Sequence, residues 1–199
     1  IMSHARPRPN AVAHRQVDPI ALENNSGANA GEPIQLVWVD PSAGFNGTGT
    51  YESPLNSLQS YSNQPGNDMI IVGNGTLAGA VTLFDDQSLV SEWMLNQQQY
   101  FLDTDRGEIP LPGVDPLAAI PTFWNPAAAD GNAGGTIVTV AGSRTEIGGI
   151  IFDGAVSSGV YANAITTAPV WSIGGFDIHD NQFDNTRNSV VFNNNSSDG

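Results

Sequence analysis

A short phrase near the end of the chain occurs twice, and it constrains the fold more than any other feature. Residues 147–154 read IGGIIFDG, and residues 173–181, which begin twenty-six positions later, read IGGFDIHDN. A period of about 20–50 residues is typical of stacked architectures, in which each repeat covers its neighbour. The bend after the phrase is four residues longer in the second copy, because Val160 and Val190 lie thirty residues apart. Stacked strands need matching inward apolar positions, whereas their turns tolerate such insertions.

The composition favours many short strands and turns over long helices. The 199 residues include 22 glycines and 13 prolines, and Asn and Asp recur throughout. Hydrophobic residues make up 40% of the chain, which is enough for the core of one sizeable domain. Asn suits the turns of a stack, because it tolerates left-handed backbone angles and its amides can pair from one repeat to the next.

The charge and the absence of cysteine exclude several classes of partner and site. The chain has 20 acidic residues against 6 basic ones, all arginine, and its net charge is −14. Repulsion of phosphate groups removes the main source of affinity for nucleic acid and for anionic lipid. Without cysteine there are no disulfides, zinc–thiolate sites or thiol nucleophiles. No run reaches the roughly 18 apolar residues of a membrane-spanning helix, so no direct membrane span is expected.

The two ends of the chain give expectations about its context. Residues 1–33 are polar, proline-bearing and rich in Asn and Ala, which predicts an extended linker or an arm that docks on a neighbour. No signal peptide opens the chain, and an apolar run stands just before its end. We therefore expect it to come from a longer precursor, with the structured part at 34–199.

Strands are expected over most of the structured part. Residues 33–40 predict a strand with Ile34, Leu36 and Trp38 on one apolar face, residues 69–76 a second strand, and strands resume from Thr136. Residues 53–63 predict a short amphipathic helix, because Ser53 is a natural N-cap and is followed by a proline at the first helical position. We expect this helix to cap the open edge and apolar end of the first repeat.

Two segments are harder to assign. Residues 85–100 fit one helix or two short strands that break at Ser91–Glu92, and strands are preferred because the helical spacing of apolar residues is poor. Residues 103–133 carry five prolines between Pro110 and Pro126. Proline lacks the amide donor and fixes the backbone, so this segment predicts an irregular excursion with no core strand.

A series of motifs near the start of the structured part carries a family resemblance. The series is a strand with WVD at 38–40, a Gly/Asn loop, G-T-x-x-x-P at 49–54, a short segment, and N-D-x-I-x-V-x-x-G-T at 67–76. It resembles the opening of right-handed parallel β-helix proteins of bacterial surfaces, with Asn67 where the family often has glycine. The later FDDQSLVSE is similar to a following L-x-D-x-Q-x-L-x-G segment, with Ser91 in place of glycine.

The resemblance extends over about residues 34–195, and it implies a fold, a place and a role. The fold would be all-β: a right-handed parallel β-helix (solenoid) with a short N-terminal capping helix and an extended N-terminal arm. More narrowly, the chain is similar to the β-helix passengers of inverse-autotransporter-like proteins, which are extracellular and anchored in the outer membrane through flanking segments. The implied role is that of a non-enzymatic structural or adhesive shaft. Its expected partners are copies of itself, neighbouring surface proteins or glycans.

Aspartates near the expected turns are the candidate metal ligands: Asp153, Asp177, Asp180 and Asp184. Calcium is the ion they would hold, because it prefers carboxylate, amide and carbonyl oxygens. Two other interpretations stay open. One is the acid pair of a glycosidase, with carboxylates about 5–10 Å apart, and the other is a set of solvated turn residues without a ligand. His179 stands beside Asp180, but one imidazole does not make a metal site.

Two competing functions remain on the same fold. A carbohydrate-active enzyme, a polysaccharide lyase or hydrolase, is one of them. Resemblance to pectate-lyase-like enzymes would imply an arginine or lysine base beside calcium carboxylates, and Arg144 and Arg187 are the basic residues expected in the stacked part. A glycan-binding module is the other, with Trp93, Trp124 and Trp171 stacked on sugar rings. No catalytic motif with a recognisable spacing is present, and no cofactor other than calcium is expected.

Overall fold

The chain folds mostly into β-strands that form parallel sheets. The computed structural model describes residues 30–31, 33–58, 63–65, 69–97, 101–104, 106–111, 117–125, 135–157, 160–169 and 173–193. These residues form three parallel sheets, with five, four and four strands, and two antiparallel hairpins. The expected arm at 1–33 lies almost wholly outside the described residues, and it stays a prediction.

The first sheet has the order β1 (Leu36–Val39), β2 (Met69–Val72), β5 (Ser88–Ser91), β10 (Glu146–Gly148) and β15 (Asp177–His179). The second sheet has the order β3 (Thr76–Ala78), β8 (Thr122–Trp124), β11 (Ile151–Asp153) and β16 (Gln182–Asp184). The third has the order β4 (Val81–Leu83), β9 (Thr136–Val140), β14 (Asn163–Thr167) and β17 (Asn188–Val191). The hairpins are β6 (Phe101–Thr104) with β7 (Gly107–Pro110), and β12 (Ala155–Ser157) with β13 (Val160–Tyr161).

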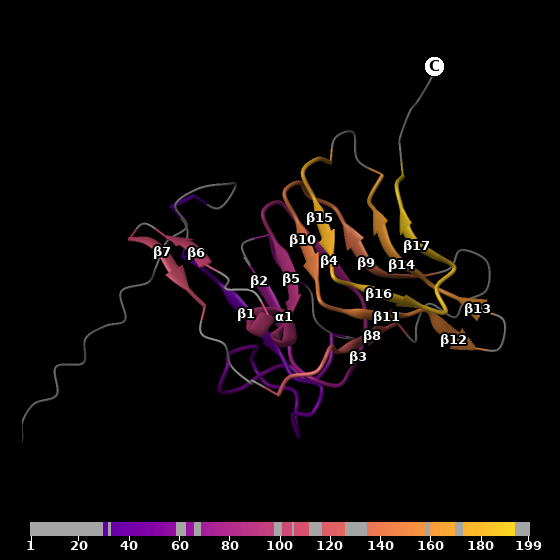
Figure 1. The fold of residues 1–199 in the computed structure, drawn as a ribbon, viewed down its shortest axis with the longest axis horizontal. Coiled ribbons are helices and arrows are strands. Elements are labelled where there is room, and N and C mark those ends of the chain that lie inside the picture. The colour runs from indigo at the N-terminus through magenta and orange to yellow at the C-terminus, as the bar shows by residue number, and fades with distance from the viewer. Residues whose placement is uncertain are drawn as a thin grey trace, which may run out of the picture.

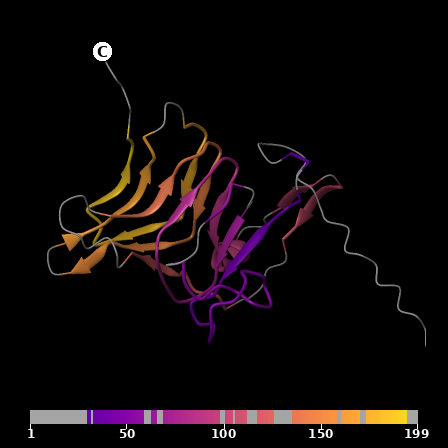
Figure 2. The same ribbon diagram turned by 180° about the vertical axis from the view of Figure 1, so that it is seen from behind.

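The chain passes through the three sheets in the same order four times, and we call each passage a round. Round one is β2–β3–β4, round two β5–β8–β9, round three β10–β11–β14 and round four β15–β16–β17, while β1 precedes them beside β2. The rounds follow one another along the long axis of the molecule, from indigo to yellow (Figure 1), and Figure 2 shows the same succession from behind. Each sheet is parallel because every round enters it in the same direction.

The core is built from apolar side chains that repeat at the same register position in successive rounds. In the second sheet, Leu77, Phe123, Phe152 and Phe183 follow one another across the ladder. The ring centroids of Phe123 and Phe152 lie 6.2 Å apart, and those of Phe152 and Phe183 lie 5.5 Å apart. The first and third sheets contribute similar columns: Ile70, Leu89, Ile147 and Ile178, and Val81, Val138, Ile165 and Val190. These columns face one interior and form one continuous core.

The first sheet is buried on both of its faces at the β1 end. Val37 and Val39 face the main core, and Leu36 and Trp38 pack on the outer face in a second apolar cluster. The helix α1 (Glu92–Gln97) contributes Leu95 to that cluster. The expectation of a single apolar face on this strand is therefore wrong. A strand covered on both faces reads as a nearly continuous apolar run, and such a run does not show which face is inside.

The helix expected at 53–63 is not formed in its described part, residues 53–58. Leu55 pairs with Val39 in a parallel bridge, its amide donates to the Trp38 carbonyl, and its carbonyl accepts from the Asp40 amide. Residues 59–62 lie outside the described part. Ser53 therefore does not cap a helix, because the edge of β1 supplies backbone partners to the segment that follows Ser53. An extended segment therefore satisfies that edge, and a helix could not.

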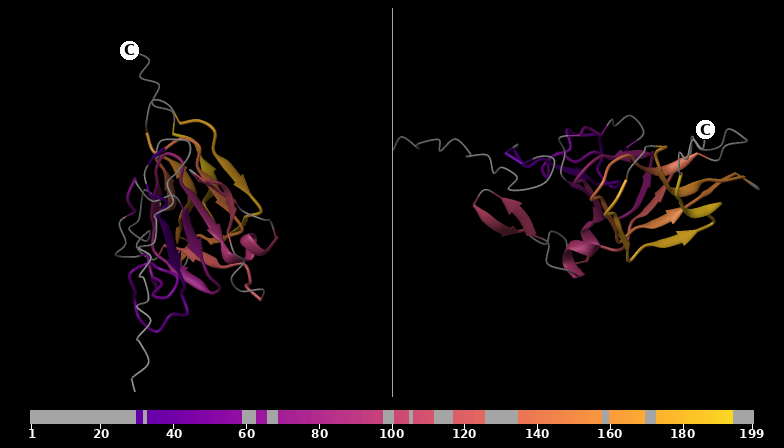
Figure 3. Two further views of the ribbon diagram at one scale, coloured as in Figure 1. Left: turned by 90° about the vertical axis from the view of Figure 1, so that its left-hand side faces the viewer. Right: turned by 90° about the horizontal axis from the view of Figure 1, so that it is seen from above.

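The predictions for residues 85–100 and 103–133 also need correction. Residues 85–100 contain both expected forms in succession, the strand β5 and the helix α1, which begins where the strands were expected to break. The excursion at 103–133 is interrupted by β8, a core strand whose Phe123 is 1% exposed. The prolines do not prevent β8, because Pro121 and Pro126 lie outside it and the Pro121 carbonyl accepts from the Ile151 amide. The hairpin β6–β7 stands apart from the sheets (Figure 3).

The register of the repeat differs from the one that the IGG phrases indicate. Ile147 pairs with Ile178, thirty-one residues later, and Val190 pairs with Ile165, where Val160 was expected. The two glycine pairs serve different turns. Gly149 has φ 70° in the turn after β10, whereas Gly175 has φ 69° in the turn before β15. The phrases look alike because both turns need a left-handed residue, which glycine adopts at little cost.

Asn side chains join successive rounds at strand starts and in turns, which agrees with the amide pairing that the sequence predicts. At the first residues of β17 and β14, Asn188 donates to the side-chain oxygen of Asn163 at 2.8 Å. The amide group of Asn181 donates to the Ile147 carbonyl at 2.8 Å and accepts from the Ile150 amide at 3.0 Å. Asn185 adopts the left-handed conformation, with φ 49°. Amides in the turns therefore satisfy backbone groups of the round below.

The aromatic column of the second sheet gives the first prediction. Phe152→Ala removes a side chain that is 0% exposed and that touches a ring on either side. We expect the free energy of unfolding to fall by about 3–5 kcal/mol, because the cavity cannot close between the neighbouring rounds. Urea denaturation followed by circular dichroism measures the change. Phe45→Ala is the control, because Phe45 is 69% exposed, and an equal loss in both variants would contradict the stacked core.

Candidate functional site

The four candidate aspartates are divided between two places. Asp153 and Asp184 are register partners on β11 and β16 of the second sheet. Asp177 belongs to β15 of the first sheet, and Asp180 follows that strand, with φ 53°. The structure therefore divides the aspartates where the sequence suggests one cluster, and of the four only Asp153 and Asp184 are register partners.

Local groups already contact the Asp153 and Asp184 pair. Asp153 Oδ1 accepts from the Ala155 amide at 3.0 Å and from Asn185 Nδ2 at 3.3 Å. Both carboxylate oxygens of Asp184 accept from Gln182 Nε2 at 3.0 Å. Among the described residues, no group of three or more His, Asp or Glu side chains is placed to hold a metal ion. The aspartates thus have the geometry of turn and ladder residues, and calcium binding stays a prediction.

Asp180 belongs to a polar network on the outer face of the first sheet, and Asp177 lies near it. Ser88 Oγ donates to Glu146 Oε2 at 2.9 Å, across the ladder from β5 to β10. His179 Nε2 lies 3.0 Å from Glu146 Oε1, and His179 Nδ1 lies 3.0 Å from Asp180 Oδ2. The network thus runs over three neighbouring strands, with the imidazole between two carboxylates. Sequence analysis treated His179 as an isolated histidine, because its partner Glu146 lies thirty-three residues earlier in the chain.

Glycine at position 148 makes room for the imidazole. A methyl group on Gly148 would lie 3.0 Å from His179 Cε1 and 3.1 Å from His179 Nε2. The ring therefore lies across this glycine, which is the register partner of His179 on β10. Met94 of α1 borders the same place, with its Cε 3.5 Å from that methyl position.

The network changes the acidity of His179. Its partial burial opposes the charged form, but the hydrogen bonds to Asp180 and Glu146 and the nearby charge of Asp177 outweigh that effect. Together they raise the pKa of His179 above its ordinary value of 6.5. The protonated imidazole then joins Glu146 on β10 to Asp180 just after β15, so the network is a pH-dependent contact between rounds three and four.

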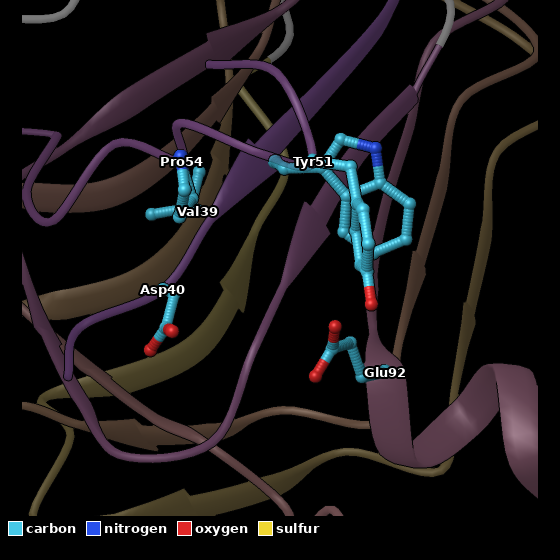
Figure 4. Close-up of a pocket in the computed structure, with 6 residues that line it drawn as sticks. Val39, Asp40, Tyr51, Pro54 and Glu92 are labelled. Atoms are coloured by element: carbon cyan, nitrogen blue, oxygen red, sulfur yellow. The ribbon is translucent and has the colours of Figure 1, made fainter. Parts of the chain in front are cut away.

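A shallow pocket lies at the opposite end of the first sheet. It is lined by Trp38, Val39, Asp40, Tyr51, Pro54 and Glu92 (Figure 4). The strand β1 supplies the first two residues, the segment after it the next three, and Glu92 is the first residue of α1. The rings of Trp38 and Tyr51 meet edge to face, with centroids 5.1 Å apart and planes at 72°. In Figure 4 the Tyr51 hydroxyl points toward the Glu92 carboxylate, and Asp40 lies across the pocket from it.

The floor of the pocket depends on a glycine and on a fixed carboxylate. A methyl group on Gly73 would lie 3.4 Å from Glu92 Oε2 and 3.6 Å from Asp40 Cα. The Gly73 amide donates to the Val39 carbonyl at 2.7 Å, which holds the floor against β1. Asp40 is held by Ser42, whose amide and hydroxyl donate to Asp40 Oδ1 at 2.8 Å and 2.6 Å. Gly73 thus lies between the backbone of Asp40 and the carboxylate of Glu92, where a larger residue would place a side chain.

The remaining candidates lie elsewhere. Trp93 is on α1 and Trp124 is on β8, each half-buried, and Trp171 is outside the described residues. Arg144 follows β9 and makes an ion pair with Asp86, in which Nη2 donates to Asp86 Oδ2 at 2.9 Å. Arg187 is exposed in the turn before β17.

The pocket cannot be found from the sequence for a physical reason. Trp38 reads as part of an apolar strand face, and Tyr51 and Glu92 belong to motifs that indicate a fold but no site. A tryptophan directly followed by Val-Asp at the end of a strand was the available signal, because an outward aromatic there lies next to the turn carboxylate.

Comparison with known proteins gives no relative from which a function can be transferred. No protein-family model matches the chain, and neither a curated protein nor a solved structure matches it. Among the described residues, no helix has the length and apolar character that crossing a membrane requires.

The His179 network predicts how stability depends on pH. A raised folded-state pKa means that the contribution is fully present below the ordinary value of 6.5 and is lost as pH rises through the folded value. We expect His179→Gln to lower the free energy of unfolding by up to about 1 kcal/mol at acidic pH and by less at alkaline pH. Urea denaturation from about pH 5.5 to about pH 8.5 measures this difference.

An NMR titration of the imidazole checks the same prediction directly. The pKa of His179 should lie above 6.5 in the native protein and fall in Glu146→Gln, which keeps the size of the partner but removes its charge. Asp153→Asn is the matched control, since Asp153 pairs with Asp184 in the second sheet. A native pKa at or below 6.5 would show that the network does not form in solution.

Proposed function

We propose that this chain is a non-enzymatic structural or adhesive protein, in which the three sheets wind as a right-handed parallel β-helix and form a rigid shaft. The parallel in-register pairing of successive rounds and the single core that joins them support this proposal. Stiffness follows, because each round is fixed to its neighbours by a ladder in every sheet. The place of action is the cell surface or the extracellular space, with an outer-membrane anchor in flanking segments, as the resemblance to surface β-helix proteins suggests.

The two ends of the stack differ, and the first end is covered. Leu55 and Leu58 close it with 7% and 1% exposure, and they form bridges to Val39 and Gly79. The Gly49 carbonyl accepts from the Trp38 amide at 2.8 Å, so that backbone groups on the outer side of β1 are used. Within the described residues, the outer edge of β1 at Trp38 and Asp40 is therefore already paired and less open to another strand.

The open face of round four is the observation that carries the proposal. Ile147, Phe152 and Ile165 of round three are 1%, 0% and 0% exposed. Their register partners in round four, Ile178, Phe183 and Val190, are only partly buried. Within the described part of the chain, β15, β16 and β17 each lie at the end of their sheet.

An edge of this kind accepts a further β-segment. Three strands present backbone donors and acceptors in one plane, and apolar side chains stand between them. Phe176 and Phe192 add a stacked pair at 5.4 Å, and Phe192 is 63% exposed. Another round, supplied by further chain or by a second copy, would bury all of these groups, so the shaft lengthens by addition at this end.

The charged residues favour the shaft over a lyase or a hydrolase. The hydrogen bond and the charge of Asp86 raise the pKa of Arg144, whereas a lyase base must give up its proton. The four aspartates are divided between two sheets, with Asp153 paired to Asp184 and Asp177 to Glu146, which supports structural roles at the turns. A screen against neutral and acidic glycans, with and without calcium, separates the functions. Release of reducing or unsaturated ends would identify an enzyme.

Addition at round four predicts association of the isolated chain. We expect the mass measured by light scattering after size-exclusion chromatography to rise with concentration between about 10 µM and about 500 µM. Phe183→Lys should abolish the rise, because a charge on the open face has to be buried in the interface. A monomer at every concentration in the native protein would contradict association between copies.

The control for this experiment is Phe45→Lys. Phe45 is also an exposed phenylalanine, with 69% exposure, but it lies in the segment that follows β1 at the covered end. We expect this variant to associate like the native chain. Circular dichroism of both variants shows whether the sheets are kept. If Phe45→Lys keeps the circular dichroism spectrum of the native chain but no longer associates, the interface lies elsewhere.

A further inference from the structure

We propose that the pocket between β1 and α1 binds the head group of an organic cation, an ammonium or a guanidinium. Its walls are the edge-to-face pair of Trp38 and Tyr51, and its rim carries the carboxylates of Asp40 and Glu92. Aromatic faces attract cations through their quadrupole, and carboxylates supply charge-assisted hydrogen bonds. The site is separate from round four, so it does not depend on the shaft proposal.

The balance of hydrogen-bond groups favours a cation over a neutral sugar. The polar groups on the side chains that line the pocket are two carboxylates, the Tyr51 hydroxyl and the Trp38 indole N–H, so acceptors outnumber donors. A sugar hydroxyl both donates and accepts, whereas an ammonium has three donors and a guanidinium five, and neither has an acceptor. The shape agrees, since rings at 72° form a corner around a compact group, while a sugar ring stacks on one flat face.

The pocket is also open to such a ligand. Tyr51 is 56% exposed, although it is a large aromatic residue next to a buried strand. The chain carries a net charge of −14, which raises the local concentration of cations and speeds their approach. The ligand would lie above Gly73, which has no side chain to fill the space between Asp40 and the Glu92 carboxylate.

The glycine at the floor gives the sharpest test. Gly73→Ala would place a methyl group at ordinary contact distance, 3.4 Å from the nearest atoms, so folding should be kept. The same methyl occupies the space between Asp40 and Glu92, and binding should weaken by about ten-fold. Gly44→Ala is the matched control, because a methyl group there meets nothing within 4 Å.

The measurement is a titration followed through the indole N–H signal of Trp38 in a ¹H–¹⁵N NMR spectrum. Trp38→Phe assigns this signal among the 4 tryptophans. The probes are butylammonium, choline, arginine, a Gly-Lys-Gly peptide and, as the neutral probe, methyl glucoside. We expect the cations to shift the signal with dissociation constants of about 1 mM, weakened by added salt. The free amines and the peptide distinguish a small ligand from a lysine side chain as the source of the ammonium.

Variants of the pocket walls separate the attraction of the aromatic ring from that of the carboxylate. Tyr51→Ala and Glu92→Gln should each weaken binding about three- to ten-fold, while Tyr161→Ala and Asp177→Asn, exposed residues of the same types elsewhere, should leave it unchanged. A shift caused by methyl glucoside alone, equal binding in Gly73→Ala and Gly44→Ala, or no shift with any cation would each overturn the proposal.

Discussion

The contact between like residues of successive rounds is the interaction on which the rest of this structure depends. Phe123, Phe152 and Phe183 occupy one register position in three neighbouring strands, and their rings touch in sequence. A single round buries little apolar surface by itself, because its side chains gain cover only from the rounds on either side. Stability is therefore shared along the stack, and a residue in its middle contributes more than the same residue at an end.

This dependence explains which parts of the fold the sequence predicts. Apolar alternation and glycine-rich turns indicate strands that stack, and the parallel sheets agree. The register of the strands cannot be predicted in the same way. The IGG phrase reflects only the left-handed backbone conformation that two different turns require, at Gly149 and at Gly175. Equivalent positions are set by side chains that meet in the core, such as Phe152 and Phe183, and one sequence with bends of unequal length does not reveal that pairing.

The candidate sites show the same limit. Aspartates were grouped by their closeness in sequence, yet a stack brings together residues about one round apart, so Asp153 meets Asp184 and Glu146 meets His179. The helix expected at Ser53 failed for a related reason. Local capping signals describe what a segment would do alone, whereas the free edge of β1 gives Leu55 backbone partners that no local rule includes.

The hairpin β12–β13 has a consequence for engineering. It fills the corner between β11 and β14, and its neck is closed by the Ala162 amide, which donates to the Gly154 carbonyl at 2.8 Å. The next round turns the same corner with residues 185–187 alone. The connection between the second and third sheets can therefore differ in length from one round to the next. A foreign peptide inserted beyond the neck of the hairpin would be displayed outside the sheets, without changes to the core beneath it.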